Sequence, residues 1–300
     1  MSEIFDFLKK TESERRRKQR IQEPELLLNM SPEALALPTL DEVDKSPEAP
    51  EPLPPEIEVC QSDKFDLTGA SPQLRSVLHS LTLVGEQFRL LRSRLEIMQK
   101  QTGIKTVLIT STAPGEGKTF TASCLAGIIA QEAGKRVLLI DADLRRPMSG
   151  RYFGLNGTGS TAGLSEVLRG KAEFSNVLLT SLNPEFSFLP SGPPSSNPSE
   201  LLSSPKLEQT LKFAADHFDW VILDSPPALA LSDTTIISPL CDTVILVVRS
   251  NSTPSKLILQ AIDRIGRDHI CGVVLNRKKD MHRSRYYYHY YYRRSNPKKD

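Results

Sequence analysis

The segment TSTAPGEGKT, residues 110–119, follows an aliphatic run at 106–109 and precedes a helical pattern that begins at Phe120. The run is too short for a helix, and two glycines with a proline predict a tight turn after it. A strand followed by a glycine loop and a helix is the first half of a β–α–β unit. This feature places the chain among the α/β folds, because such a unit needs a parallel partner strand.

Downstream of this unit the chain repeats the same alternation. Short aliphatic runs lie at 137–140, 186–189, 221–223, 243–248 and 273–275, and helical patterns lie at 86–98, 120–133, 163–168, 198–217 and 255–267. Several runs are apolar at every position, which is typical of parallel strands buried on both faces. We therefore expect a mostly parallel β-sheet flanked by helices, with ligands bound at the carboxyl edge of the sheet.

The glycine loop has the chemistry of a phosphate-binding loop. In such loops backbone N–H groups and the helix N-terminus hold phosphate oxygens, a lysine reaches the β and γ phosphates, and a threonine hydroxyl binds Mg²⁺. These roles fall on Lys118, on Thr119 and on the loop residues Pro114, Gly115, Glu116 and Gly117. The strict pattern GxxxxGK[ST] fails at its first position, where Thr112 stands. The sequence predicts a P-loop NTPase that uses ATP and Mg²⁺.

Acidic side chains follow two other predicted strands. The run at 137–140 ends in Asp141 and Asp143, and the run at 221–223 ends in Asp224. Because parallel strands end at the same edge of a sheet, these carboxylates should lie beside the P-loop, where phosphoryl transfer needs a metal shell and a proton acceptor. Asn276 follows the last strand, and its amide has the donor and the acceptor needed to pair with an adenine edge.

The formal net charge of +2 hides an uneven distribution along the chain. Residues 1–20 hold seven Lys/Arg and four Asp/Glu, whereas residues 21–65 hold eleven acids, two bases and eight prolines. We divide the chain into a basic amphipathic segment at 1–20, an acidic Pro-rich disordered linker at 21–77, a P-loop domain at 78–280 and a mobile tail at 281–300. The first segment either docks on a partner or an anionic membrane surface, or is a solvated basic end.

The sequence carries no signal for a membrane span or for secretion. Its longest aliphatic stretches, at 137–140 and 244–248, are far shorter than the ~18 apolar residues that a spanning helix needs. The N-terminus has no long apolar stretch between a basic start and a cleavage site. We expect a cytoplasmic protein.

Six of the seven tyrosines are clustered near the C-terminus, at Tyr286, Tyr287, Tyr288, Tyr290, Tyr291 and Tyr292. Residues 277–300 also carry nine Lys/Arg against two Asp. Aromatic residues interspersed with Lys and Arg can stack on the bases of single-stranded nucleic acid. No OB, RRM or KH pattern accompanies them here, so we expect no nucleic-acid partner. Beside a Mg-nucleotide site, such a cluster of phenols indicates a phosphoryl acceptor.

Together these motifs resemble the bacterial tyrosine kinases, the autokinases that regulate capsular and exopolysaccharide synthesis. The resemblance covers roughly residues 80–292 and includes PGEGKT at 114–119, LLIDADLRRP at 138–147, VILDSPP at 221–227 and the tyrosine cluster. It implies an ATP-dependent, non-specific protein-tyrosine kinase whose subunits phosphorylate one another's tails and thereby control polysaccharide chain length.

The resemblance also implies roles for individual residues. Lys118 would neutralise phosphate charge, and Asp141 and Asp143 would be the base and the organiser of the metal or of a water. Thr119, Asp143 and Asp224 would hold the Mg²⁺. Which aspartate accepts the proton stays open. The helix at 86–98 would contact the next protomer of a ring-type homo-oligomer through Glu86, Arg89 and Arg92.

Further partners follow from the family alone. Many relatives carry two transmembrane helices where this chain has the acidic linker. A separate membrane activator of the chain-length-determinant type is therefore implied, with recruitment of the kinase to the inner face of the plasma membrane. A tyrosine phosphatase would reverse the modification.

Two other functions compete with the kinase. The first alternative is a ParA/MinD-like ATPase switch that binds a membrane-associated partner, and the second is a scaffold whose tail only binds. Ala113 occupies the place of the signature lysine of the ParA/MinD group. That substitution and the tyrosine cluster favour the kinase over the switch.

Overall fold

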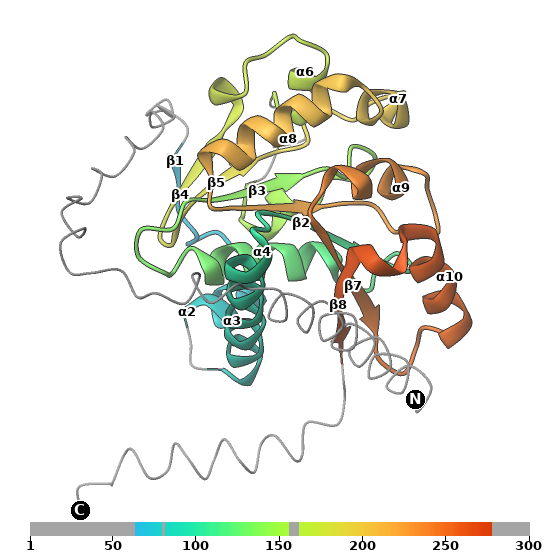
Figure 1. Ribbon diagram of the computed structural model, residues 1–300. Coiled ribbons are helices and arrows are strands. Elements are labelled where there is room, and N and C mark those ends of the chain that lie inside the picture. The colour runs from blue at the N-terminus through green and yellow to red at the C-terminus, as the bar shows by residue number, and fades with distance from the viewer. Residues whose placement is uncertain (1–63, 80–81, 156–161, 278–300) are drawn as a thin grey trace, which may run out of the picture. The chain divides into compact units, whose positions relative to one another are not determined.

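The computed structural model describes residues 64–79, 82–155 and 162–277 (Figure 1). The predicted basic segment at 1–20, most of the predicted linker and the tyrosine cluster at 286–292 lie outside these residues.

An eight-stranded sheet forms the centre of the described residues, in the order β1-β4-β5-β3-β6-β2-β7-β8. The strands are β1 (Lys64–Phe65), β2 (Thr106–Ser111), β3 (Val137–Asp141), β4 (Leu179–Leu182), β5 (Glu185–Leu189), β6 (Trp220–Asp224), β7 (Thr243–Arg249) and β8 (Ile270–Asn276). All neighbouring strands are parallel except β4 and β5, which are antiparallel. The expected mostly parallel sheet is confirmed.

Helices cover both faces of this sheet (Figure 1). The α-helices are α2 (Pro72–His79), α3 (Leu83–Thr102), α4 (Lys118–Ile129), α5 (Ser149–Tyr152), α6 (Leu164–Leu168), α7 (Pro198–Leu202), α8 (Pro205–His217), α9 (Asp233–Ile237) and α10 (Ser255–Ile265). Short 3₁₀ turns lie at Ser175–Val177, Ser238–Leu240 and Arg267–His269. In Figure 1, α3 and α4 lie on one side of the sheet and α8 on the other.

The middle of the sheet is buried on both faces. Every residue of β2, β3 and β6 is buried, as their apolar runs predict. Helix α4 contacts these three strands as well as α2 and α3, and all its residues from Thr121 to Ile129 are buried. At Gly127 a Cβ atom would lie 2.7 Å from Cδ2 of Leu78, so the glycine allows α2 to pack closely. The loop that precedes α4 is therefore attached to a helix that is packed on several sides.

The predicted linker ends at residue 77, but folded structure begins earlier, at residue 64. Strand β1 pairs with β4, and α2 buries Leu74 and Val77. Phe65 packs edge-on against Phe186, with ring centroids 6.1 Å apart. The boundary was wrong because the composition of the whole segment, rich in acids and proline, masked its last apolar positions.

Two local features also differ from the sequence pattern. The single helix expected at 198–217 is two helices, α7 and α8, because Pro205 begins a new helix after the turn at 203–204. Strand β4 was not predicted, since its four residues carry no continuous apolar run and its one buried residue is Ser181.

Candidate active site

The predicted phosphate-binding loop joins the end of β2 to the start of α4. Gly115 and Gly117 have φ values of 78° and 100°, a region that favours glycine. A Cβ atom at Gly117 would lie 2.0 Å from Nδ2 of Asn276, so no side chain fits there. At Gly115 a Cβ atom would meet nothing within 4 Å, which makes this the open side of the loop. The backbone N–H groups at the start of α4 are thus available to an anion.

Glu116 shapes this loop from within. Its Oε2 accepts hydrogen bonds from the backbone N–H groups of Thr112 (2.7 Å) and Ala113 (3.0 Å), and its Oε1 accepts one from the hydroxyl of Thr253. The residue is only 3% exposed. The sequence assigned Glu116 to nucleotide binding, but its carboxylate is committed to the protein and supports the loop. One of these two N–H groups belongs to Thr112, the position where the strict pattern has glycine.

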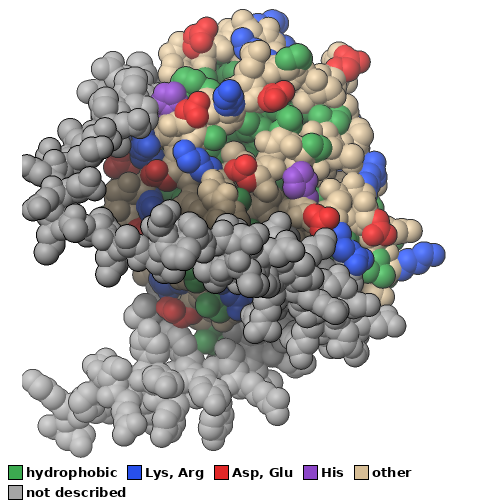
Figure 2. Space-filling view, in the orientation of Figure 1, with side chains coloured by type: hydrophobic (Ala, Val, Ile, Leu, Met, Phe, Trp, Pro, Cys, Tyr) green, Lys and Arg blue, Asp and Glu red, His purple; other side chains and the backbone are tan. Residues whose placement is uncertain are grey.

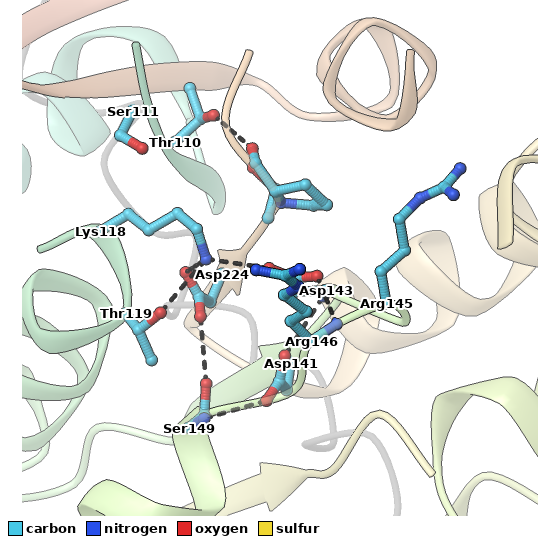
Figure 3. A network of polar contacts seen from close by, with 12 residues as sticks. Thr110, Ser111, Lys118, Thr119, Asp141, Asp143, Arg145, Arg146, Ser149 and Asp224 are labelled. Atoms are coloured by element: carbon cyan, nitrogen blue, oxygen red, sulfur yellow. Dashed lines mark hydrogen bonds and ion pairs between the residues drawn. The ribbon is translucent and has the colours of Figure 1, made fainter. Parts of the chain in front are cut away.

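Lys118 extends from α4 toward the ends of two strands (Figure 3). Its Nζ lies 3.2 Å from Oδ2 of Asp143, 3.4 Å from Oδ1 of Asp224 and 3.2 Å from Oγ1 of Thr119. The predicted meeting of the lysine with the two aspartate loops is therefore present. Burial would lower the pKa of the ammonium group, but the charges of Asp224 and Asp143 outweigh burial and raise it. Lys118 carries a firm positive charge at this site.

Asp141 is buried, like Asp224, and its carboxylate is held by backbone N–H groups. Its Oδ1 accepts from the N–H of Asp143 (3.2 Å), and its Oδ2 accepts from the N–H of Ser149 (3.0 Å). Burial, followed by the nearby charge of Asp224, raises the pKa of Asp141 to about 7. Burial also raises the pKa of Asp224. Asp224 is paired with Lys118, whereas the hydrogen bonds to Asp141 come from the backbone.

Ser149 joins the two aspartate loops and was not predicted from the sequence. Its hydroxyl donates to Oδ2 of Asp224 at 3.2 Å, while its own N–H bonds to Asp141. Figure 3 shows it at the start of α5, beneath both aspartates. The only signal in the sequence is a serine soon after LLIDADLRRP, which by itself does not reveal a contact to a motif 75 residues away.

A cavity of about 560 Å³ opens beside this cluster. It is lined by Pro114, Gly115, Gly117, Lys118, Thr119, Asp143, Arg145, Arg146, Met148, Tyr152, Pro226, Pro227, Ala230, Leu231 and Arg277. Among the three predicted aspartates, Asp143 is the one on this lining. The size and the mixed polar and apolar walls are those of a site for a small molecule.

Asn276 lies at the predicted edge but its amide faces the loop. Nδ2 donates to the backbone oxygen of Glu116 at 2.8 Å, and Oδ1 accepts from the N–H of Arg277 at 2.8 Å. Arg277, which lines the cavity, has a positive φ of 54°, and the hydrogen bond from its N–H to Asn276 accompanies this conformation. The pairing of Asn276 with adenine stays a prediction.

The residues expected to contact another protomer lie away from this cavity, on α3. Glu86 and Arg89 form an ion pair of 2.7 Å. Arg92 donates to the backbone oxygen of Ile128 in α4 at 3.2 Å and lies 3.1 Å from Glu96. Arg92 therefore ties α3 to α4 within one subunit, whatever it does between subunits.

The side chains present fit a nucleotide with Mg²⁺. The open glycine loop and the charged Lys118 suit phosphates, and the Thr119 hydroxyl with the Asp224 carboxylate supplies the oxygen ligands that Mg²⁺ prefers. Within the described ranges no three His, Cys, Asp or Glu side chains form a metal site by themselves. Fold and site together define the class as a P-loop nucleotide-binding domain.

Comparisons with known proteins narrow this class. Residues 104–268 match the AAA domain family. The chain is 37% identical over 207 residues to the tyrosine-protein kinase YwqD of Bacillus subtilis (strain 168), an alignment that covers 68% of this chain and 86% of that protein. The kinase domain of Escherichia coli tyrosine kinase ETK superposes with a TM-score of 0.64 at 33% identity, covering 72% of this chain and 85% of that one. The chain belongs to the bacterial tyrosine-protein kinases, as its motifs indicated.

Other similarities are more limited. The chain spans only 26% of the length of the tyrosine-protein kinase etk of Escherichia coli (strain K12), to which it is 38% identical. The cell division ATPase MinD of Pyrococcus furiosus matches with a TM-score of 0.50 at 22% identity, covering 60% of this chain and 74% of that one. This likeness concerns the fold alone. The helices that the structure describes include none with the length and the hydropathy of a membrane span.

Proposed function

We propose that this protein is an ATP-dependent tyrosine autokinase that phosphorylates the tyrosine cluster at 286–292 of a neighbouring subunit. The observation that supports it most is the position of Lys118, whose ammonium group lies between the carboxylates of Asp143 and Asp224 at the edge of the cavity. A fixed charge of this kind holds phosphate oxygens during transfer.

In the proposed reaction the phenol oxygen of the acceptor bonds to the γ-phosphorus of ATP. The bond from that phosphorus to the β–γ bridging oxygen breaks, and ADP leaves with the electron pair. Asp143 is the aspartate that lines the cavity, so we assign it as acceptor of the phenol proton. Asp141 holds the backbone of Asp143 in place. Mg²⁺, held by Thr119 and Asp224, would neutralise charge on the phosphates.

The test uses the full chain with ATP and Mg²⁺, read by an anti-phosphotyrosine blot and by mass spectrometry of the tail. Transfer between subunits is examined by mixing Lys118→Met protein, which keeps its tail, with an active chain in which the six clustered tyrosines are phenylalanine. Phosphotyrosine should appear on the Lys118→Met tail. If the wild-type chain gains no phosphotyrosine in its tail, the proposal fails.

A MinD-like switch is the second candidate, because the fold matches MinD. Such a protein would hydrolyse ATP and change its assembly without forming phosphotyrosine. The tail blot therefore separates the two candidates. Ala113, which lies in the loop at the place of the partner-reaching lysine, favours the kinase.

The cellular setting is part of the same proposal. The kinase would act in the cytoplasm on capsule or exopolysaccharide synthesis, as a ring-type homo-oligomer recruited to the plasma membrane by a chain-length-determinant protein. A tyrosine phosphatase would return the tail to its starting state. The family to which the chain belongs supports this setting, and pull-down from cells with the tagged full chain tests each partner.

A further inference from the structure

Two adjacent arginines at the cavity have opposite surroundings. Arg145 is anchored: its Nε donates to Oδ2 of Asp233 at 2.8 Å, and its Nη2 donates to Oδ1 of Asp233 and to Ser199. Arg146 is exposed, and its guanidinium makes no hydrogen bond or ion pair with any residue that the structure describes. Figure 3 shows the two side chains pointing in different directions. Arg146 is therefore free to bind something else.

The backbone of Arg146 is nevertheless held by the reaction site. Its backbone N–H donates to Oδ1 of Asp143 at 3.0 Å, so the arginine follows the aspartate assigned as base. It lines the cavity together with the apolar residues Met148, Pro227 and Leu231, and Met148 is 40% exposed. An apolar wall beside a free guanidinium suits an aromatic ring whose neighbour is a carboxylate.

The charge that an incoming peptide meets at this cavity is positive. Asp141, Asp143 and Asp224 are 1%, 6% and 0% exposed, and the last two are paired with Lys118. Arg146 and Arg277, in contrast, are exposed on the lining. On the face shown in Figure 2 acidic and basic side chains are interspersed. We call the exposed Arg146 and Arg277 on the cavity lining its cationic rim.

The chain's own tail does not match this rim. Residues 277–300 carry nine Lys/Arg against two Asp, so the clustered tyrosines approach with like charge. Within an assembly, a high effective concentration of tails can offset such a mismatch. A separate protein has no such advantage and needs complementary charge.

We infer that Arg146 is a specificity residue for a second class of substrate: tyrosine segments of other proteins that are flanked by Asp or Glu. This inference rests on the kinase function proposed above and goes beyond the tail. The apolar wall of Met148, Pro227 and Leu231 would contact the tyrosine ring of the substrate. The Arg146 guanidinium would pair with the carboxylate of an Asp or Glu that lies one or two residues from that tyrosine in the substrate chain.

Binding tests this without any need for phosphoryl transfer. Two fluorescent peptides carry phenylalanine in place of the acceptor tyrosine and differ only in having glutamate or lysine on both sides. Anisotropy is measured on the full chain with Mg²⁺ and a non-hydrolysable ATP analogue. We expect wild type to bind the glutamate peptide about tenfold tighter than the lysine peptide. Arg146→Gln should weaken binding of the glutamate peptide about fivefold, and Arg146→Glu should bind the two peptides with equal affinity.

Arg75→Glu is the matched control, because Arg75 is exposed on α2 and is not on the cavity lining. The substitution changes the net charge by the same amount as Arg146→Glu. Its preference for the glutamate peptide should equal that of wild type. Equal affinities for the two peptides, no detectable binding of the glutamate peptide, or an equal loss of both peptides with Arg146→Glu would overturn the inference. The phosphotyrosine blot of the tail decides the proposed function separately.

Discussion

The hydroxyl of Ser149 donates a 3.2 Å hydrogen bond to Oδ2 of Asp224, so the first residue of α5 is fixed to the last residue of β6. Both groups are fully buried. The bond holds Asp224 beside Lys118. It also links the two aspartate loops, which lie far apart in the sequence.

We predict that Ser149→Ala lowers the free energy of unfolding by about 1–3 kcal/mol, because a buried carboxylate oxygen loses its donor. Urea unfolding measures the loss. Ser123→Ala is the matched control: the Ser123 hydroxyl is buried and has no hydrogen-bond partner among the described residues, so its removal should be neutral or stabilising. Equal destabilisation by both variants would contradict the role given to Ser149.

Lys118→Met should reduce tail phosphorylation by at least about 10², since the charge that faces the phosphates is removed. The apolar part of the side chain keeps its packing, and the far-ultraviolet circular dichroism should remain that of wild type. A quantitative phosphotyrosine assay gives the rate. Activity within a factor of two or so of wild type would mean that phosphate binds elsewhere.

Glu116→Ala should weaken nucleotide binding by about tenfold or more, because the N–H groups of Thr112 and Ala113 lose a charged acceptor and the loop loses its shape. Titration calorimetry with Mg-ADP measures the affinity. Glu116→Gln keeps one acceptor oxygen and should lie between wild type and Glu116→Ala. If Glu116→Ala bound Mg-ADP like wild type, the carboxylate would have no part in forming the loop.

Asp242 gives a prediction about pH. Its Oδ2 accepts from the N–H of Lys105, the N–H of Thr106 and the Thr106 hydroxyl, each at 2.8 Å. Burial alone would raise the pKa of Asp242, but these hydrogen bonds outweigh burial and lower it. Because the folded-state pKa lies below the unfolded value of about 3.9, the carboxylate stabilises the fold above that value and loses this effect as pH falls through the folded-state pKa.

Because Asp242 is exposed and solvent screens its charge, Asp242→Asn should be less stable than wild type by only about 0.5–1 kcal/mol at pH 7. The difference should shrink toward zero as the pH is lowered below about 3.9. Urea unfolding at a series of pH values gives the difference. Asp242→Ala removes all three bonds and should remain less stable at every pH. A constant gap between wild type and Asp242→Asn would show that ionisation of Asp242 does not contribute.

Local sequence patterns were enough to predict the fold class and the edge of the sheet where the site lies. Apolar runs gave six of the strands, because burial on both faces leaves a continuous pattern, and the loop residues from Pro114 to Thr119 identified the phosphate site through local chemistry. Asp141, Asp143 and Asp224 could be placed beside Lys118 because parallel strands end at one edge.

Tertiary structure alone decided what each polar group does there. Glu116 turns inward to Thr112, and Ser149 bridges Asp141 and Asp224. Arg145 is anchored, while the Arg146 guanidinium has no partner among the described residues. It also decided that 64–77 is folded, through Phe65 and Leu74. The reason is physical: these outcomes depend on contacts between residues distant in the chain, and such contacts leave no periodic pattern in the sequence around either partner.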